Sequence, residues 1–198
     1  MKYLVPAIIA VMISCIAPVH AAAPKASGYL PDYDHLIEGE YLEAYWVDPP
    51  RVERSSTPHI LLGTISVDGI RDHKGVTVVN CVDWLKRDLK SGRVISDGQE
   101  AKYRLDLAIT HMDPGSAAKR LLAGEFGAGH AQLQIEGEVI DVEKGEVVAM
   151  FAERRRSSGA IGIEDLAGDA GPHIIEHLVS LISTDVNSEL LASFLSRS

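Results

Sequence analysis

The chain has 198 residues, of which 46% are hydrophobic and 24% charged. These values are typical of one globular domain with a core large enough to fold without disulfide bonds or a structural metal. Its formal net charge of −9 argues against nucleic acid as a partner and against electrostatic docking on anionic lipid. Of its two cysteines, Cys15 lies in the N-terminal segment, which leaves Cys81 without an internal disulfide partner. The fold must therefore rest on its hydrophobic core.

The first 21 residues predict export. Lys2 precedes an apolar run over residues 3–13, and Val19 and Ala21 are the small residues expected at a cleavage site. We therefore expect a signal peptide over residues 1–21 and a location in the periplasm. In an alternative interpretation Cys15 ends a lipobox and carries lipid, so that the protein is a lipoprotein anchored to the outer membrane. No other contact with a membrane is expected.

After the export signal we expect a flexible leader over residues 22–27 and a single domain over residues 28–198. Short strands are predicted at residues 42–47, which end before Pro49 and Pro50, and at residues 60–67. A helix of about four turns is predicted from Val78 to the stop signal at Ser91 and Gly92. Its apolar face carries Val78, Val82, Leu85 and Leu89.

Period-two alternation predicts two longer strands, at residues 103–110 and 130–139. The turn at residues 141–145 contains Gly145, which can adopt a positive φ, so residues 146–155 are expected to return as the second strand of a hairpin. We expect a glycine-rich loop over residues 157–171 and a final helix from Pro172 to about Phe194. Together these elements predict an α+β fold, with an antiparallel-rich sheet of about five strands and two main helices packed on one face.

The segment from His173 to His177 matches the H-x-x-E-H pattern of zinc-binding helices, in which two histidines one turn apart reach one metal and Glu176 acts as base. A zinc-dependent hydrolase is thus an alternative function. It needs a further carboxylate ligand, and Glu189 would lie about 18 Å along the helix from His177, too far to share an ion. The simpler interpretation places His173 and His177 on the polar edge of an amphipathic helix. Accordingly we expect no cofactor and no metal.

Three other features carry little chemistry. Ser116 and Lys119 match S-x-x-K, but the companion motifs of serine β-lactamases are missing, so Ser116 is expected to cap a short helix. The glycines of residues 124–129 precede a strand, whereas a phosphate-binding loop follows one. Cys81 lies beside the apolar face of the first helix without a neighbouring histidine, so we expect a core residue and not a nucleophile.

The segment Ser27-Gly28-Tyr29-Leu30-Pro31-Asp32-Tyr33 resembles the start of the mature domain in an uncharacterised family of Gram-negative envelope proteins, domain of unknown function 3313. The likeness continues through residues 127–129, the alternating strand that ends at Asp141, and the strand that closes at Arg154 and Arg155. Members are often lipoproteins, and Cys15 stands where their acylated cysteine stands. The resemblance implies an envelope location and transfers no catalytic residue.

The sequence favours a non-enzymatic envelope protein, a binding or structural domain whose partner is another envelope component, protein or glycan. Tyr29, Asp32 and Tyr33 are the candidate partner-binding residues, because aromatic side chains beside a carboxylate on an irregular segment suit recognition. The competing interpretation is that this segment only fastens the leader onto the sheet.

Overall fold

The computed structural model describes residues 24–39, 42–48, 60–67, 70, 78–91, 101–116, 129–157 and 162–182. The expected signal peptide, Cys15 and the chain after residue 182 lie outside these residues. Eight elements are described, in the chain order β1 (Ile37–Glu38), β2 (Ala44–Val47), β3 (Ile60–Ser66), α1 (Val78–Ser91), β4 (Tyr103–Asp113), β5 (Gln132–Asp141), β6 (Glu146–Arg156) and α3 (Ile163–Ile182).

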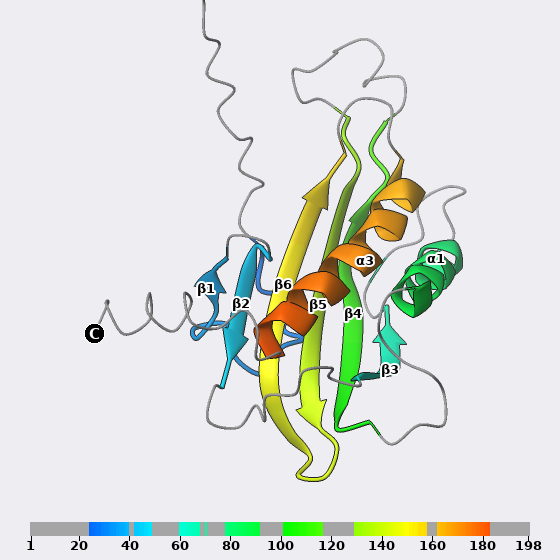
Figure 1. Ribbon diagram of the computed structural model, residues 1–198. Helices are drawn as coiled ribbons and strands as arrows, with labels where there is room; N and C mark the ends of the chain where they lie inside the picture. The colour runs from blue at the N-terminus through cyan, green and yellow to red at the C-terminus, as the bar shows by residue number, and fades with distance from the viewer. Residues whose placement is uncertain are drawn as a thin grey trace, which may run out of the picture.

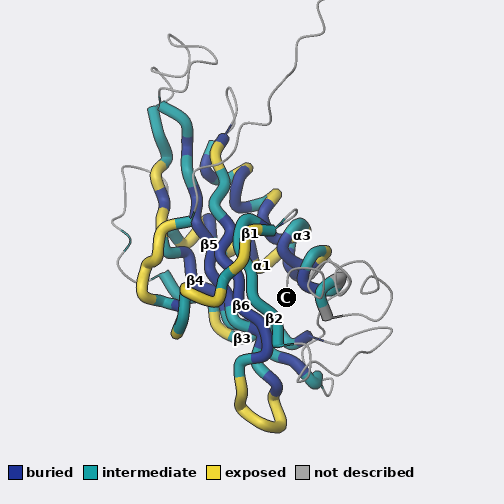
Figure 2. Tube along the Cα trace, turned by 90° about the vertical axis from the view of Figure 1, so that its left-hand side faces the viewer, coloured by how far each residue is buried: buried dark blue, intermediate teal, exposed yellow. Residues whose placement is uncertain are grey.

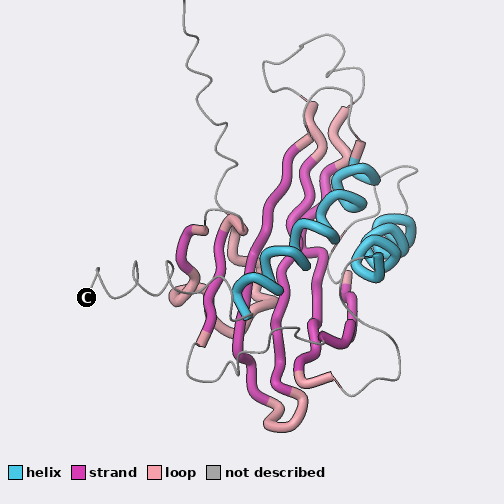
Figure 3. Tube along the Cα trace, viewed as in Figure 1, coloured by secondary structure: helices cyan, strands magenta, loops and turns pink. Residues whose placement is uncertain are grey.

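The strands of the described residues form one sheet in the order β1-β2-β6-β5-β4-β3, with both helices on one side of it (Figure 1, Figure 3). All neighbouring pairs are antiparallel except β3 and β4, which run parallel. The predicted α+β class is therefore confirmed. The sheet has six strands where about five were expected, since the two-residue β1 pairs with β2 through Ile37 and Tyr45.

The β5–β6 hairpin forms as predicted. Gly145 has a φ of 69°, the left-handed conformation that glycine adopts without strain. The carboxylate of Asp141 accepts hydrogen bonds from the backbone N–H groups of Glu143 and Lys144, at 3.1 and 3.0 Å. These bonds close the turn, and they hold the pKa of Asp141 below its ordinary value, chiefly through the N–H of Lys144.

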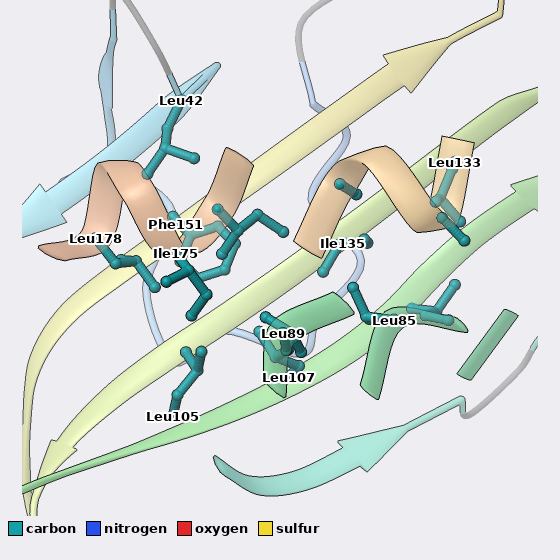
Figure 4. Close-up of a cluster of buried hydrophobic side chains, with 14 of the residues drawn as sticks. Leu42, Leu85, Leu89, Leu105, Leu107, Leu133, Ile135, Phe151, Ile175 and Leu178 are labelled. Carbon is teal, nitrogen blue, oxygen red and sulfur yellow. The ribbon is translucent and has the colours of Figure 1, made fainter. Parts of the chain in front are cut away.

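Alternation along β4, β5 and β6 separates an apolar face from a polar one. Leu107, Ile135 and Phe151 point toward the helices, where they meet Leu85 and Leu89 of α1 in the main core (Figure 4). Figure 2 shows how little of these central strands is exposed, in contrast to the hairpin turn. The other face of the sheet carries polar side chains, and it is this face that positions the candidate site.

One strand has an irregularity that changes the polar face. The register of β4 against β5 shifts between Ile109 and His111, so that Thr110 is the extra residue of a β-bulge. Its hydroxyl reaches Glu136 of β5 on the polar face. Strict alternation already places Thr110 on that face; the bulge adds His111 to it, opposite Gln134, and returns Met112 to the core face, opposite Leu133.

The prediction for the last helix was wrong at its start. Residues 157–171 were expected to be a loop, but α3 begins at Ile163 and runs through Gly168, Gly171 and Pro172. Asp165 accepts a hydrogen bond from the N–H of Gly162 at 3.1 Å, which satisfies a free donor at the helix start. Packing of α3 on α1 and the sheet thus overrides the local helix-breaking preferences of glycine and proline.

Glycines of α3 face α1 closely. A Cβ built on Gly171 would lie 3.1 Å from the backbone N of Leu89, and one built on Gly168 would lie 3.3 Å from the ring of Trp84. The absence of side chains at these two positions lets the helices approach. Helix α1 itself spans residues 78–91 as predicted, with Leu85 and Leu89 fully buried. No described helix is both long and apolar enough to cross a membrane.

Candidate functional site

The N-terminal segment of residues 24–36, here called the N-terminal strap, crosses the polar face of the sheet, behind the strands in the view of Figure 1. It folds around one hydroxyl. The phenolic oxygen of Tyr33 accepts hydrogen bonds from the backbone N–H groups of Ser27, Gly28 and Leu30, at 3.2, 3.0 and 3.2 Å. Gly28 has a φ of 90°, which lets the strap turn over the Tyr33 ring.

Beneath the strap lies a carboxylate that has no exposed surface. Glu136 accepts hydrogen bonds at Oε2 from Tyr33 Oη (2.5 Å) and Ser27 Oγ (2.9 Å). At Oε1 it accepts from Thr110 Oγ1 (2.8 Å) and Gln134 Nε2 (2.7 Å). All four partners are neutral donors. A buried carboxylate is tolerated when its lone pairs are filled in this way, and here the filling depends on the strap.

A second contact fixes the direction of the strap. The side-chain amide of Gln134, which is almost fully buried, accepts from the N–H of Lys25 at 3.1 Å and donates to its carbonyl oxygen at 2.6 Å. The amide therefore imitates the backbone of one more strand. With Tyr33 and Ser27 on Glu136, the strap is bonded to β5 at two successive positions of the polar face.

Beside the strap is a cleft of about 530 Å³. Tyr29 and its neighbours in the strap form one wall, and β3 and β4 form the other. Four of the residues that line it carry a hydroxyl group: Ser27, Tyr29, Ser66 and Thr110. This volume lies within the range of small-ligand sites, about 300–1,000 Å³.

Negative charge surrounds this cleft. Burial, together with the charges of Glu138, Asp106 and Glu136, raises the pKa of Tyr29 to about 12, so the phenol stays protonated. Asp106 and Glu138 stand directly opposite each other on β4 and β5. Burial and the charge of Asp106 raise the pKa of Glu138. Asp106 has a countercharge, since Arg104 Nη2 lies 2.9 Å from its Oδ2.

The predicted partner-binding residues have different roles. Tyr33 is committed to the strap and to Glu136, which favours the fastening interpretation for that residue. Tyr29 is half-buried and lines the cleft, where a ligand could reach it. Asp32 lies on the outside of the strap, with His35 Nδ1 2.5 Å from its Oδ2 and the N–H of Asp34 2.7 Å from its Oδ1. The hydrogen bond with His35 is the main reason that the pKa of Asp32 is lowered.

The candidate zinc residues all lie on α3. The rings of His173 and His177 meet edge to face with their centroids 4.3 Å apart, while Glu176 is exposed. His173 Nε2 lies 3.6 Å from the carboxylate of Glu153 on β6. Burial, followed by the neighbouring His173, lowers the pKa of His177. In the part of the chain that the structure describes, no group of three or more His, Cys, Asp or Glu side chains could hold a metal.

A second pair of acidic residues, Glu43 just before β2 and Glu153 on β6, links these two strands. The N–H of Glu43 donates to Glu153 Oε2 at 3.0 Å, and the N–H of Arg154 donates to Glu43 Oε2 at 2.9 Å. Glu43 Oε1 is buried and accepts no hydrogen bond from any described residue. Burial, with the charge of Glu153 as the next largest raising cause, raises the pKa of Glu43 to about 7.

The predictions for Cys81, Ser116 and the glycine-rich segment remain. Cys81 is fully buried in the core, as expected, and burial raises the pKa of its thiol to about 11. The N–H of Ser116 donates to the carbonyl of Gly129 at 2.9 Å. The short helix expected after Ser116, and most of the glycine-rich segment, lie outside the described residues.

Glu136, Gln134 and Thr110 belong to the site although no motif in the sequence marks them as functional. Alternation placed Gln134 and Glu136 on one face of a strand, but gave no sign that this face is covered. A signal was present in the strap, where Ser27 and Tyr33 supply hydroxyls that suit a buried carboxylate. Linking them to Glu136 requires contacts between residues more than 100 positions apart.

Residues 79–162 match a family model described as Domain of unknown function (DUF4410), a stretch that is less than half of the chain. Similarity to a domain of unknown function is therefore confirmed at that level, although the family expected from the opening motif is not the one matched. No curated protein matches the sequence.

Solved structures give distant likenesses. A PelC dodecamer from Paraburkholderia phytofirmans shares 14% identity, over 62% of this chain and 90% of that chain, with a TM-score of 0.43. Protein XCC0632 from Xanthomonas campestris shares 12%, over 66% and 88%, with a TM-score of 0.40. Lipoprotein GNA1162 from Neisseria meningitidis shares 9%, over 61% and 97%, with a TM-score of 0.32. At these TM-scores the likenesses carry no conclusion about this chain.

Proposed function

We propose that the protein is a non-catalytic binding module of the bacterial cell envelope, and that it recognises a protein partner at the cleft between the N-terminal strap and strands β3 and β4. The observation that carries the proposal is the construction of this cleft. The strap is bonded to Gln134 and Glu136, and this fixed segment holds the accessible ring of Tyr29 against a wall of hydroxyl groups.

Rigid support for an aromatic side chain is what recognition requires. Tyrosine offers a large contact area at low cost in side-chain entropy, and its hydroxyl adds one directional contact. Because Tyr33, and not Tyr29, holds the strap in place, Tyr29 is free to serve a partner without any loss of the fold. The strap thus separates a supporting tyrosine from a contacting one.

The envelope location rests on the sequence. The apolar run of residues 3–13, followed by small residues up to Ala21, supports export to the periplasm, and Cys15 is the alternative point of attachment to the outer membrane. The likeness of the opening motif to the domain of unknown function 3313 family supports the same location.

The test is site-specific photo-crosslinking in the native host. p-Azidophenylalanine replaces Tyr29 in one variant and Val142, which is 48% exposed on the distant hairpin turn, in the control. We expect a discrete covalent protein adduct from position 29 only, because only that position faces the cleft. Adducts of the same mass from both positions, or none from position 29, would refute the proposal. A glycan adduct would replace the protein partner by a saccharide.

A further inference from the structure

Three hydroxyl groups of the cleft residues, those of Ser27, Ser66 and Thr110, already donate their hydrogens to other groups of the protein. Ser27 Oγ and Thr110 Oγ1 donate to Glu136, at 2.9 and 2.8 Å, and Ser66 Oγ donates to the carbonyl of Leu107 at 3.4 Å. A hydroxyl has one hydrogen to donate and two lone pairs. Ser27 Oγ also accepts from the backbone N–H of Tyr29 at 3.1 Å, which leaves it one lone pair. What the three groups still offer the cleft is acceptor capacity, so a ligand that satisfies them must bring N–H or O–H donors.

The carboxylates behind the walls give the cleft negative surroundings. Glu136 carries its negative charge directly beneath Ser27 and Thr110, and its four bonded partners are all neutral. Donation to a carboxylate polarises a hydroxyl and makes its oxygen a better acceptor. Glu138 adds a second negative group close to Tyr29, whereas the charge of Asp106 is paired with that of Arg104.

We infer that the cleft binds a primary ammonium or guanidinium group, of the kind that a lysine or arginine side chain of a protein partner would insert against Tyr29. This inference rests on the proposed function and names the chemistry that the site recognises. Such a group brings several N–H donors and no acceptor, which matches walls that offer acceptors. Its charge suits the acidic surroundings, and the Tyr29 ring offers a cation–π surface.

The experiment titrates the full mature protein with four small probes and follows its backbone amide signals by NMR. Nα-acetyl-lysine amide carries the ammonium group, Nα,Nε-diacetyl-lysine amide is its neutral analogue, and Nα-acetyl-glutamate amide is an anion. Cadaverine represents a free amine that does not come from a protein. We expect saturable shifts at Gly28, Tyr29, Ser66 and Thr110 with the cationic probes, and none with the neutral or anionic ones.

Two matched variants test the role of charge. Glu138→Gln removes a negative group near Tyr29, whereas Glu143→Gln makes the same change on the exposed hairpin turn. A single partly exposed carboxylate, several ångströms from a bound cation, changes the affinity for that cation by about fivefold. The Glu138→Gln variant should therefore bind the lysine amide about fivefold more weakly, and the Glu143→Gln variant should bind it like the unmodified protein.

The four probes distinguish the chemistry of the ligand from its source. Binding of the lysine amide but not of cadaverine supports a protein side chain as the source, and the reverse supports a free amine; both support the ammonium chemistry. Equal binding of the neutral analogue, preference for the anion, or no shifts at the cleft with any probe overturns the inference. Photo-crosslinks from position 29 would still stand in those cases, so failure of the ligand chemistry is distinguishable from failure of the proposed function.

Discussion

A single residue, Glu136, shows what period-two alternation can and cannot predict. The pattern correctly placed Gln134, Glu136 and Glu138 on one face of a strand. It implied nothing about burial, yet Glu136 has no exposed surface because the strap covers it. A polar face that is covered by a distant segment looks, in sequence, the same as one that faces water. Only the hydroxyls of Ser27 and Tyr33 distinguish the two cases, and they lie outside the strand.

Glu43 gives a pH prediction at the same scale. Burial raises its pKa to about 7 in the folded protein, from an ordinary value of 4.5 in the unfolded chain. Between these pH values the folded state binds the extra proton, so its stability falls as pH rises from about 4.5 to about 7 and stays reduced above that. Replacing Glu43 by glutamine keeps an acceptor for the N–H of Arg154 and removes the charge. We expect the Glu43→Gln variant to melt at a higher temperature than the unmodified protein at pH 8, with a smaller difference at pH 5.

Thermal unfolding at both pH values measures this, with Glu143→Gln on the exposed turn as the matched control. The control should show a smaller gain at pH 8, because Glu143 is not enclosed. A gain for Glu43→Gln that is equal at the two pH values would contradict the role assigned to its charge.

At the scale of elements, local pattern predicted β2 to β6 and α1, missed the two-residue β1, and placed the start of α3 at Pro172 instead of Ile163. The strands β3, β5 and β6, like α1, were found within a few residues because their apolar periodicity reflects one buried face. In α3, the local preferences of Gly168, Gly171 and Pro172 predict a loop followed by a helix start. The glycines instead allow close contact with α1, a property of the helix pair that one helix alone does not display.

This contact makes a prediction about two glycines. Alanine in place of glycine favours a helix by about 1 kcal/mol. At Gly171 the added Cβ would meet backbone atoms of α1, 3.1 Å from the N of Leu89, so α1 would have to move. At Gly168 it would meet side-chain atoms of Asp88 and Trp84, at 3.2 and 3.3 Å, which can rotate away. We expect Gly171→Ala to lower the free energy of unfolding by about 1–2 kcal/mol, since overpacking outweighs propensity.

Gly168→Ala is the control for that variant, and it should leave the free energy of unfolding unchanged or raise it by less than about 1 kcal/mol. Urea unfolding of both proteins provides the comparison. If the two substitutions had the same effect, the close approach of α1 to Gly171 would not be what requires glycine there.

For the whole molecule, the strap joins the N-terminal end of the chain to the middle of the sheet. Through Lys25, Ser27 and Tyr33 it is bonded to β5 only a few residues after the expected cleavage at Ala21. If the proposed lipid on Cys15 anchors the protein, the strap is the segment through which the domain joins that anchor, and the cleft lies beside it.

The strap also makes the last prediction, because one oxygen atom holds it. Tyr33→Phe removes the donor to Glu136 Oε2 and the acceptor of the Ser27, Gly28 and Leu30 N–H groups. A hydrogen bond to a charged group contributes about 1.5–3 kcal/mol, so we expect a loss of about 2 kcal/mol in the free energy of unfolding. Amide hydrogen exchange at Gly28 and Leu30 should accelerate as well, since both lose their acceptor.

Tyr29→Phe is the matched variant, because its hydroxyl makes no hydrogen bond with any described residue and lines the cleft. It should keep the stability and the slow exchange of the strap while it alters binding at the cleft. The opposite pattern, in which Tyr29→Phe destabilises the strap and Tyr33→Phe does not, would reverse the assignment of a supporting and a contacting tyrosine. Because the two substitutions remove the same atom from the same segment, any difference between them reports where that atom points.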